Sequence, residues 1–170
     1  MAKKLIFILS LLLICASTKA QELQVNFVIR NAGLPVDGTF SEVKIDYEFD
    51  TENVAQAYFN ATVQIESIDT GIKARDRHLL KDKYFDVERF PQMSFTSTKV
   101  EKGELGFWLE GELTIKGVTQ FLRLPLELEI VEEEGTYLKT EFTIDRRDFN
   151  VGKNHLILGD EVTVKLSLKL

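Results

Sequence analysis

Residues 43–50 read VKIDYEFD, an unbroken alternation of apolar and charged side chains. Val43, Ile45, Tyr47 and Phe49 fall on one side of an extended chain, because successive side chains of a strand point to opposite faces. The charged residues between them fall on the other side. The stretch therefore predicts a β-strand with one face buried and one face in water.

The same period of two recurs along the chain and predicts about eight strands, an all-β fold. The segments are residues 25–29, 43–49, 59–65, 93–100, 105–115, 122–130, 138–144 and 162–168. Turn residues separate them at Asn31-Ala32-Gly33, Gly38, Lys102-Gly103-Glu104, Lys116-Gly117 and Glu134-Gly135. Tight connections predict an antiparallel meander. The length of the 105–115 segment favours a closed barrel over a two-sheet sandwich, and closure also removes exposed edges.

The predicted inward face is apolar and is the candidate site. At about eight strands, a barrel interior is either filled by its own side chains or holds one small ligand. The first alternative is a structural or interaction module; the second is a binding protein for a linear lipid, whose burial is worth about 0.8 kcal/mol per methylene. Periodicity alone leaves both open. The candidate cavity residues are Phe27, Ile29, Phe49, Phe59, Val63, Ile65, Phe95, Phe107, Leu109, Leu113, Leu124, Leu126, Phe142, Val164 and Leu166.

The N-terminus has the pattern of a secretory signal peptide. Lys3 and Lys4 precede the apolar run 5–16, and small residues lead up to Ala20. The run is shorter than the about 20 residues of a membrane-spanning helix. Residues 1–20 are therefore predicted to be a leader cleaved after Ala20, residues 21–170 a single exported domain. Lipidation at Cys15 is disfavoured, because the large Ile14 precedes it.

Composition excludes several classes of protein. The chain has 21 Lys and Arg against 27 Asp and Glu, and loss of the leader, with three lysines and no acid, takes the formal charge from −6 to −9. Nucleic acid and anionic membrane surfaces are therefore not expected partners, because their phosphates repel an acidic protein at long range. Cys15, the only cysteine, leaves with the leader. Disulfides, thiol catalysis and thiolate metal sites are therefore not expected in the mature chain.

Residues 75–91, RDRHLLKDKYFDVERFP, interrupt the strand pattern. The spacing of Leu79, Leu80, Tyr84 and Phe85 predicts a short helical insertion over about residues 75–89, which Pro91 ends. Arg75 and His78 are three residues apart, as on one side of a helix. They either pair with Asp76, Asp86 or backbone carbonyls, or meet a polar head group at the cavity mouth.

A catalytic or metal-binding function finds little support in the sequence. His78 and Asp76 do not face each other on a helix. His155, the other histidine, has no second ligand at metal-binding spacing. Ser67, Ser94 and Ser97 lie in strand contexts and lack a nucleophile-elbow pattern. No enzyme activity, metal or cofactor is predicted.

Several ordered motifs resemble the YceI-like, polyisoprenoid-binding family. They are IDTGIKARDRHLLKDKYFDVERFPQMSFTSTKV, with Ser67, Ile68, Thr70, Arg75, Asp76, His78, Leu79, Phe85, Asp86, Phe90, Pro91, Phe95 and Ser97, then GELTIKGVTQFLRLPLEL, and IDRRDFNVG. The resemblance spans residues 25–168. Asn150 stands where the family usually has glycine, and since asparagine tolerates a left-handed backbone, the turn is expected to be kept.

The resemblance implies a lipocalin-like antiparallel barrel in the periplasm. Its interior would hold a polyprenyl chain or an isoprenoid quinone, with Arg75 and His78 near the mouth. Transient contact with a membrane or a membrane protein is a further expectation, because a bound lipid has to be exchanged. The choice of lipid, the direction of transfer and the oligomeric state are not set by the sequence.

Overall fold

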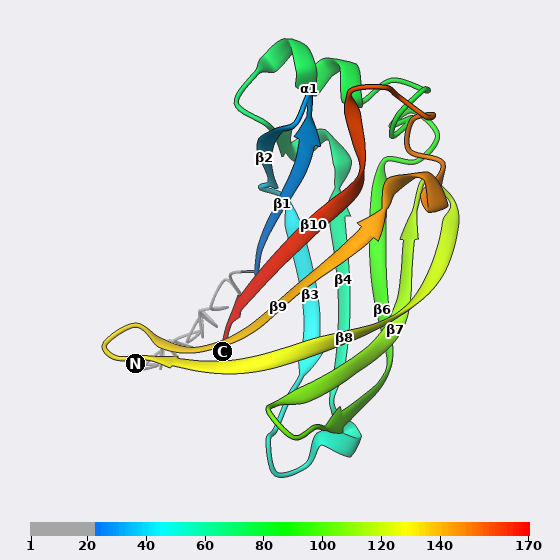
Figure 1. Ribbon diagram of the computed structural model, residues 1–170. Helices are drawn as coiled ribbons and strands as arrows, with labels where there is room; N and C mark the ends of the chain where they lie inside the picture. The colour runs from blue at the N-terminus through cyan, green and yellow to red at the C-terminus, as the bar shows by residue number, and fades with distance from the viewer. Residues whose placement is uncertain (1–22) are drawn as a thin grey trace, which may run out of the picture.

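The computed structural model describes residues 23–170, so the predicted leader lies outside the described residues. Within them, one ten-stranded sheet runs in the order β3-β4-β6-β7-β8-β9-β10-β1-β2-β5, and every paired strand is antiparallel (Figure 1). The strands are β1 (Leu23–Asn31), β2 (Leu34–Phe40), β3 (Val43–Glu48), β4 (Tyr58–Gln64), β5 (Ile68–Asp69), β6 (Gln92–Lys102), β7 (Phe107–Ile115), β8 (Val118–Val131), β9 (Gly135–Asp145) and β10 (Leu158–Lys169). The all-β, antiparallel prediction is confirmed.

The sheet curls around an interior. It bends far enough for β3, one edge, to come next to β1, although no hydrogen-bonded ladder between these two strands is found in residues 23–170. We call the line between β3 and β1 the seam. The result is a barrel-like wall whose β8–β9 ladder is also incomplete, since it joins Glu127–Val131 to Gly135–Lys139 and leaves residues 118–126 of β8 unpaired with β9.

Two of the ten strands were not among the about eight predicted ones. β2 contains Pro35 and Gly38, and Gly38, expected to break the pattern, lies inside the strand. It is paired with Phe27, and a Cβ atom on Gly38 would lie 2.2 Å from Cζ of that ring. A glycine is therefore needed for close packing here and not for a turn. β5 has two residues, too few for any periodicity.

Three apolar residues of the predicted strands do not face the interior. Leu105 lies before β7 and is 97% exposed, so the strand begins two residues later than expected. Leu128 and Ile130 alternate correctly on β8 but are exposed. They lie where the β8–β9 hairpin extends beyond the body of the sheet (Figure 1). The alternation correctly placed Leu128 and Ile130 on the same face of β8 as Leu124 and Leu126. It did not predict where the barrel-like body ends along that strand.

The helix in the insertion is shorter than predicted. α1 spans Lys73–Leu79, and residues 80–90 continue as turns stabilised by backbone bonds such as Phe85 N to Leu79 O at 3.0 Å. Asp86 adopts a positive φ of 53° within them. Leu79, Leu80 and Phe85 pack against the buried residues of β1, β2, β4 and β5. The segment therefore covers one end of the interior (Figure 1).

Three short 3-10 helices, η1 (Val54–Gln56), η2 (Ile65–Ser67) and η3 (Arg146–Phe149), complete the fold. Asn150 follows η3 with φ 57° and ψ 26°, the left-handed conformation expected for it. Within residues 23–170, no helix has both the length and the apolar character needed to span a bilayer.

Candidate functional site: an apolar cavity inside the curled sheet

The interior is hollow. A cavity of about 250 Å³ runs between the strands, whereas a single water needs only about 10–15 Å³ of such space. Side chains of all ten strands and of residues 70–85 and 146–151 surround it. The barrel-like body is therefore not filled by its own side chains, and the filled-core alternative does not describe it.

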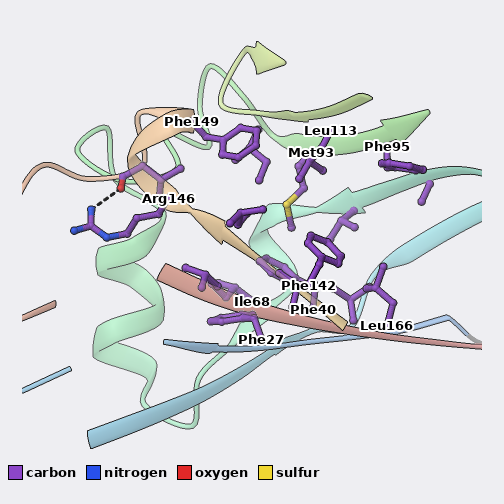
Figure 2. A pocket seen from close by; sticks show the side chains of 18 of the residues that line it. Phe27, Phe40, Ile68, Met93, Phe95, Leu113, Phe142, Arg146, Phe149 and Leu166 are labelled. Atoms are coloured by element: carbon purple, nitrogen blue, oxygen red, sulfur yellow. Dashed lines mark hydrogen bonds between the residues drawn. The ribbon is translucent and has the colours of Figure 1, made fainter. Parts of the chain in front are cut away.

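Sheet register places the wall residues in rows. On one side, Ile45, Ala61, Phe95 and Leu113 are successive partners across β3, β4, β6 and β7. A second row on the opposite side consists of Phe27, Val164 and Phe142 on β1, β10 and β9. Figure 2 shows Phe27, Phe95, Leu113 and Phe142 projecting from their strands toward the shared space.

Most of the predicted cavity residues line this space. They are Phe27, Ile29, Phe59, Val63, Phe95, Leu109, Leu113, Leu124, Leu126, Phe142, Val164 and Leu166. Phe49 and Phe107 do not, since they pack edge to face on each other with ring centroids 5.1 Å apart. Ile65 is fully buried at the start of η2, where the chain leaves the strand, and does not line the cavity either.

Arg75 and His78 separate in the structure. Arg75 lines the cavity, but its Nε donates to Thr70 Oγ1 at 2.7 Å and its Nη2 donates to the Thr70 carbonyl. His78 is exposed on α1, away from the cavity lining, with its ring 5.0 Å from that of Tyr84. Asp76 is buried and accepts from Thr70 N at 3.0 Å and from Thr70 Oγ1. This cluster ties α1 to Thr70, the residue that follows β5.

Arg146 is a buried cation at the α1 end of the cavity that the sequence analysis did not single out. Its Nε donates to Gly159 O at 2.9 Å, Nη1 to Val151 O and Lys153 O, and Nη2 to Lys153 O and Asp160 Oδ1. These contacts use all five donors of the guanidinium. Figure 2 shows the side chain beside the wall, with one of these bonds dashed. Arg146 therefore holds residues 151–160 in place. The signal available was its position in the IDRRDFNVG motif.

Thr140 is the second residue that was overlooked. It lies on β9 between Leu138 and Phe142, faces the cavity and is 8% exposed. Among the buried side-chain oxygen and nitrogen atoms of residues 23–170, Oγ1 of Thr140 is the one that has no hydrogen-bond partner. A hydroxyl at an inward position of an otherwise apolar alternation was the signal in the sequence.

Arg147, next to Arg146, has a different role. Its Nε donates to Asp145 Oδ1 at 2.9 Å, and this ion pair is the main reason that the pKa of Asp145 falls to about 2 from its ordinary 3.8. A carboxyl with a depressed pKa stabilises the fold above its unfolded pKa and loses this contribution as the pH falls toward the folded value.

We therefore expect Arg147→Met to return the pKa of Asp145 toward 3.8, as followed by its carboxyl signal in an NMR titration. Between pH 4 and pH 2, the unfolding free energy should also fall less in the variant than in the wild type. Both groups are partly exposed, so the change in stability is small. An unchanged titration of Asp145 would contradict the assignment of its shift to Arg147.

Several of the residues considered for catalysis are engaged in structural hydrogen bonds. Ser67 Oγ donates to Gln64 O at 2.7 Å, and Ser97 Oγ accepts from Phe59 N at 2.8 Å, where the β6–β7 register shifts. His155 is exposed, and its Nδ1 accepts from Ile157 N. In the described part of the chain, no three His, Cys, Asp or Glu residues lie close enough together to hold a metal ion.

Comparison with known proteins gives a consistent result. The family profile of the YceI-like domain matches residues 17–170. "Protein YceI" of Salmonella arizonae is 35% identical over 157 residues, which are 89% of this chain and 82% of that protein. A UPF0312 protein of Photorhabdus laumondii is 40% identical over 91 residues, 54% of this chain and 47% of that protein.

Solved structures share the fold. BcnA of Burkholderia cenocepacia is similar with a TM-score of 0.79 and 26% identity, over 86% of this chain and 94% of that one. A polyisoprenoid binding domain from Saccharophagus degradans is similar with a TM-score of 0.64 over 86% of this chain and 91% of that one. Its 15% identity makes this a likeness of fold.

Proposed function

The chain belongs to the YceI-like domain family, and from that premise we propose that it binds an isoprenoid lipid in its hollow interior and carries it without catalysis. The observation that carries the proposal is an apolar cavity bounded by long strands, where a hydrocarbon tail replaces empty space. Burial of such a tail is worth about 0.8 kcal/mol per methylene before ordering costs. The polyisoprenoid binding named for the Saccharophagus domain supports the same class of ligand.

The proposal includes export. Residues 1–20 have the pattern of a cleaved leader, and we propose that the mature domain, residues 21–170, works in the periplasm, where an isoprenoid tail needs a carrier to cross water. N-terminal sequencing of the protein recovered from the periplasmic fraction should begin at Gln21.

Extraction tests the binding proposal directly. Protein purified without detergent from its own cells is extracted with organic solvent, and the extract is analysed by mass spectrometry. We expect a prenyl lipid at close to one mole per mole of protein. The absence of any such lipid, together with no uptake of added isoprenoid quinone or polyprenol, would refute the proposal.

We further propose that the lipid is exchanged with a membrane at the α1 end. Leu34, at the start of β2, and Leu156 and Ile157, on the loop before β10, are exposed there. A hydrogen bond from Ala32 N to Ile157 O joins this loop to the β1–β2 turn. The three exposed residues continue the cavity wall outward, because Asn31 and Leu158, their neighbours, line the cavity. We call these three residues the rim.

The charge of the insertion also favours contact between the α1 end and a membrane. Residues 73–89 of the insertion carry six Lys and Arg against four Asp and Glu, whereas the whole chain has a formal charge of −6. An anionic bilayer therefore repels this end of the molecule less than the rest. Exposed aliphatic side chains beside basic ones are typical of surfaces that rest on membranes.

We expect Leu156→Asp to slow transfer of bound lipid to vesicles of phosphatidylethanolamine and phosphatidylglycerol by about fivefold or more, because a charge at the rim must be desolvated on contact. The amount of lipid bound should not change. Leu105→Asp is the matched control, since Leu105 is equally exposed on the β6–β7 turn at the other end of the sheet. Equal rates for the two variants would rule out the rim as the contact surface.

A further inference from the structure

Thr140 places a single unpaired hydroxyl on an apolar wall. Its partner across the β9–β10 ladder is Leu166, Leu166 is paired with Val25 on β1, and Val25 is paired with Phe40 on β2. These four residues form one row across the sheet, and all of them line the cavity. The Oγ1 atom of Thr140 is therefore surrounded by hydrocarbon on its own sheet.

The other buried polar side chains of residues 23–170 are already bonded. Thr70 and Asp76 bond to each other, and Asp86 accepts from Arg89. Arg146 uses its five donors on the 151–160 loop. Thr140 alone among them faces the hollow with its hydrogen-bonding capacity unused.

A buried hydroxyl without a partner has a cost. A buried group of this kind without a partner lowers the unfolding free energy by about 1–3 kcal/mol. Valine, an apolar residue of the same shape, carries no such cost. A threonine at this place is accounted for if something that enters the cavity supplies the partner. Within this row β9, β10 and β1 are joined by ladders, whereas the β8–β9 ladder ends at Lys139, so β9 has no ladder partner on its β8 side at Thr140.

We propose that Thr140 is a specificity-determining residue that hydrogen-bonds an oxygen atom of the lipid inside the cavity. This inference rests on the proposed function and narrows its ligand class. The lipid then carries a hydroxyl or carbonyl oxygen, as a prenol or a quinone does. This oxygen lies in the cavity beside the wall formed by β9, β10, β1 and β2. A pure hydrocarbon such as a C30 polyene leaves the hydroxyl unpaired.

The same geometry disfavours a charged head group at this depth. A phosphate beside Thr140 would be buried among Leu138, Phe142 and Leu166, and Arg146, the buried cation among the cavity-lining residues, has no donor left for it. A neutral oxygen needs one hydrogen bond only, which Thr140 can give or accept.

A pair of C30 ligands tests the inference. Squalene and hexaprenol both have 30 carbon atoms; hexaprenol carries a terminal hydroxyl, and squalene has none and joins its two halves tail to tail. Both are offered to the delipidated full-length mature protein, and the bound amounts are measured by mass spectrometry in competition. We expect the wild type to prefer hexaprenol, and Thr140→Val to reduce that preference about fivefold to tenfold, the size of one lost hydrogen bond.

Controls separate the possible outcomes. Thr143→Val changes a threonine on the outward face of the same strand, where Thr143 lies opposite Thr163, and should leave the preference unchanged. Thr140→Val removes no satisfied bond, so the variant should unfold at the wild-type denaturant concentration or above it. An unchanged preference in Thr140→Val, as expected if a trapped water satisfies the hydroxyl, would overturn the inference. If wild type and variant bound neither ligand, the proposed function itself would fail.

Discussion

Replacing Ala61 by tryptophan is expected to reduce the lipid recovered with the protein by more than tenfold while leaving the fold intact. Ala61 is the smallest residue of the row Ile45–Ala61–Phe95–Leu113, and its side chain faces the cavity. An indole at this place occupies the hollow itself. Because it enters empty space instead of a packed core, the unfolding free energy should stay within about 1 kcal/mol of the wild type.

Asn60→Trp is the matched control for this prediction. Asn60 precedes Ala61 on β4 and points to the exposed face of the same strand. The measurement is lipid per protein by extraction and mass spectrometry, alongside urea unfolding. Equal lipid contents in the two variants would show that the lipid lies elsewhere.

Arg146→Met is expected to lower the unfolding free energy by about 3 kcal/mol, the largest effect on stability among the variants considered. The change leaves the carbonyls of Val151, Lys153 and Gly159 without their donors and removes the partner of Asp160. For a domain of this size, the loss corresponds to a fall in Tm of about 6–12 °C. Amide hydrogen exchange should rise first in residues 151–160.

Arg147→Met provides the comparison, since the two arginines are neighbours in sequence. Arg147 is about 40% exposed, and its ion pairs with Asp145 and Asp160 lie at the surface. Its loss is expected to cost less than about 1 kcal/mol. Similar losses in both variants would show that burial and the loop carbonyls do not give Arg146 its role.

The strands could be predicted because alternation reports burial directly. Val43, Ile45, Tyr47 and Phe49 all lie on the less exposed face of their segment, as the pattern in VKIDYEFD requires. Strand β2 could not be predicted in the same way, because Pro35 and Gly38 obscure its pattern. The contact that makes Gly38 necessary, with the ring of Phe27, is a tertiary one.

The sequence predicted which residues face the interior, but not whether their side chains leave a cavity there. Alternation identified residues such as Phe142 and Val164, which line the cavity, but could not distinguish them from Phe49 and Phe107, which pack on each other. Whether inward side chains meet or leave a hollow depends on the curvature of the sheet, which no local pattern encodes. Arg146 was overlooked for a similar reason, because its acceptors are carbonyls of a loop.

The seam between β3 and β1 has a consequence for how a long tail gets in and out. Separating β3 from β1 breaks no ladder of backbone bonds, whereas β1–β10, β6–β7 and β7–β8 are joined by long ladders. For the proposed isoprenoid ligand, separation of β3 from β1 is a sideways route into the cavity, because no backbone ladder closes this line. The charged side chains of Lys44, Asp46 and Glu48 point outward from β3. Charges on an edge strand disfavour its pairing with a strand of another protein molecule.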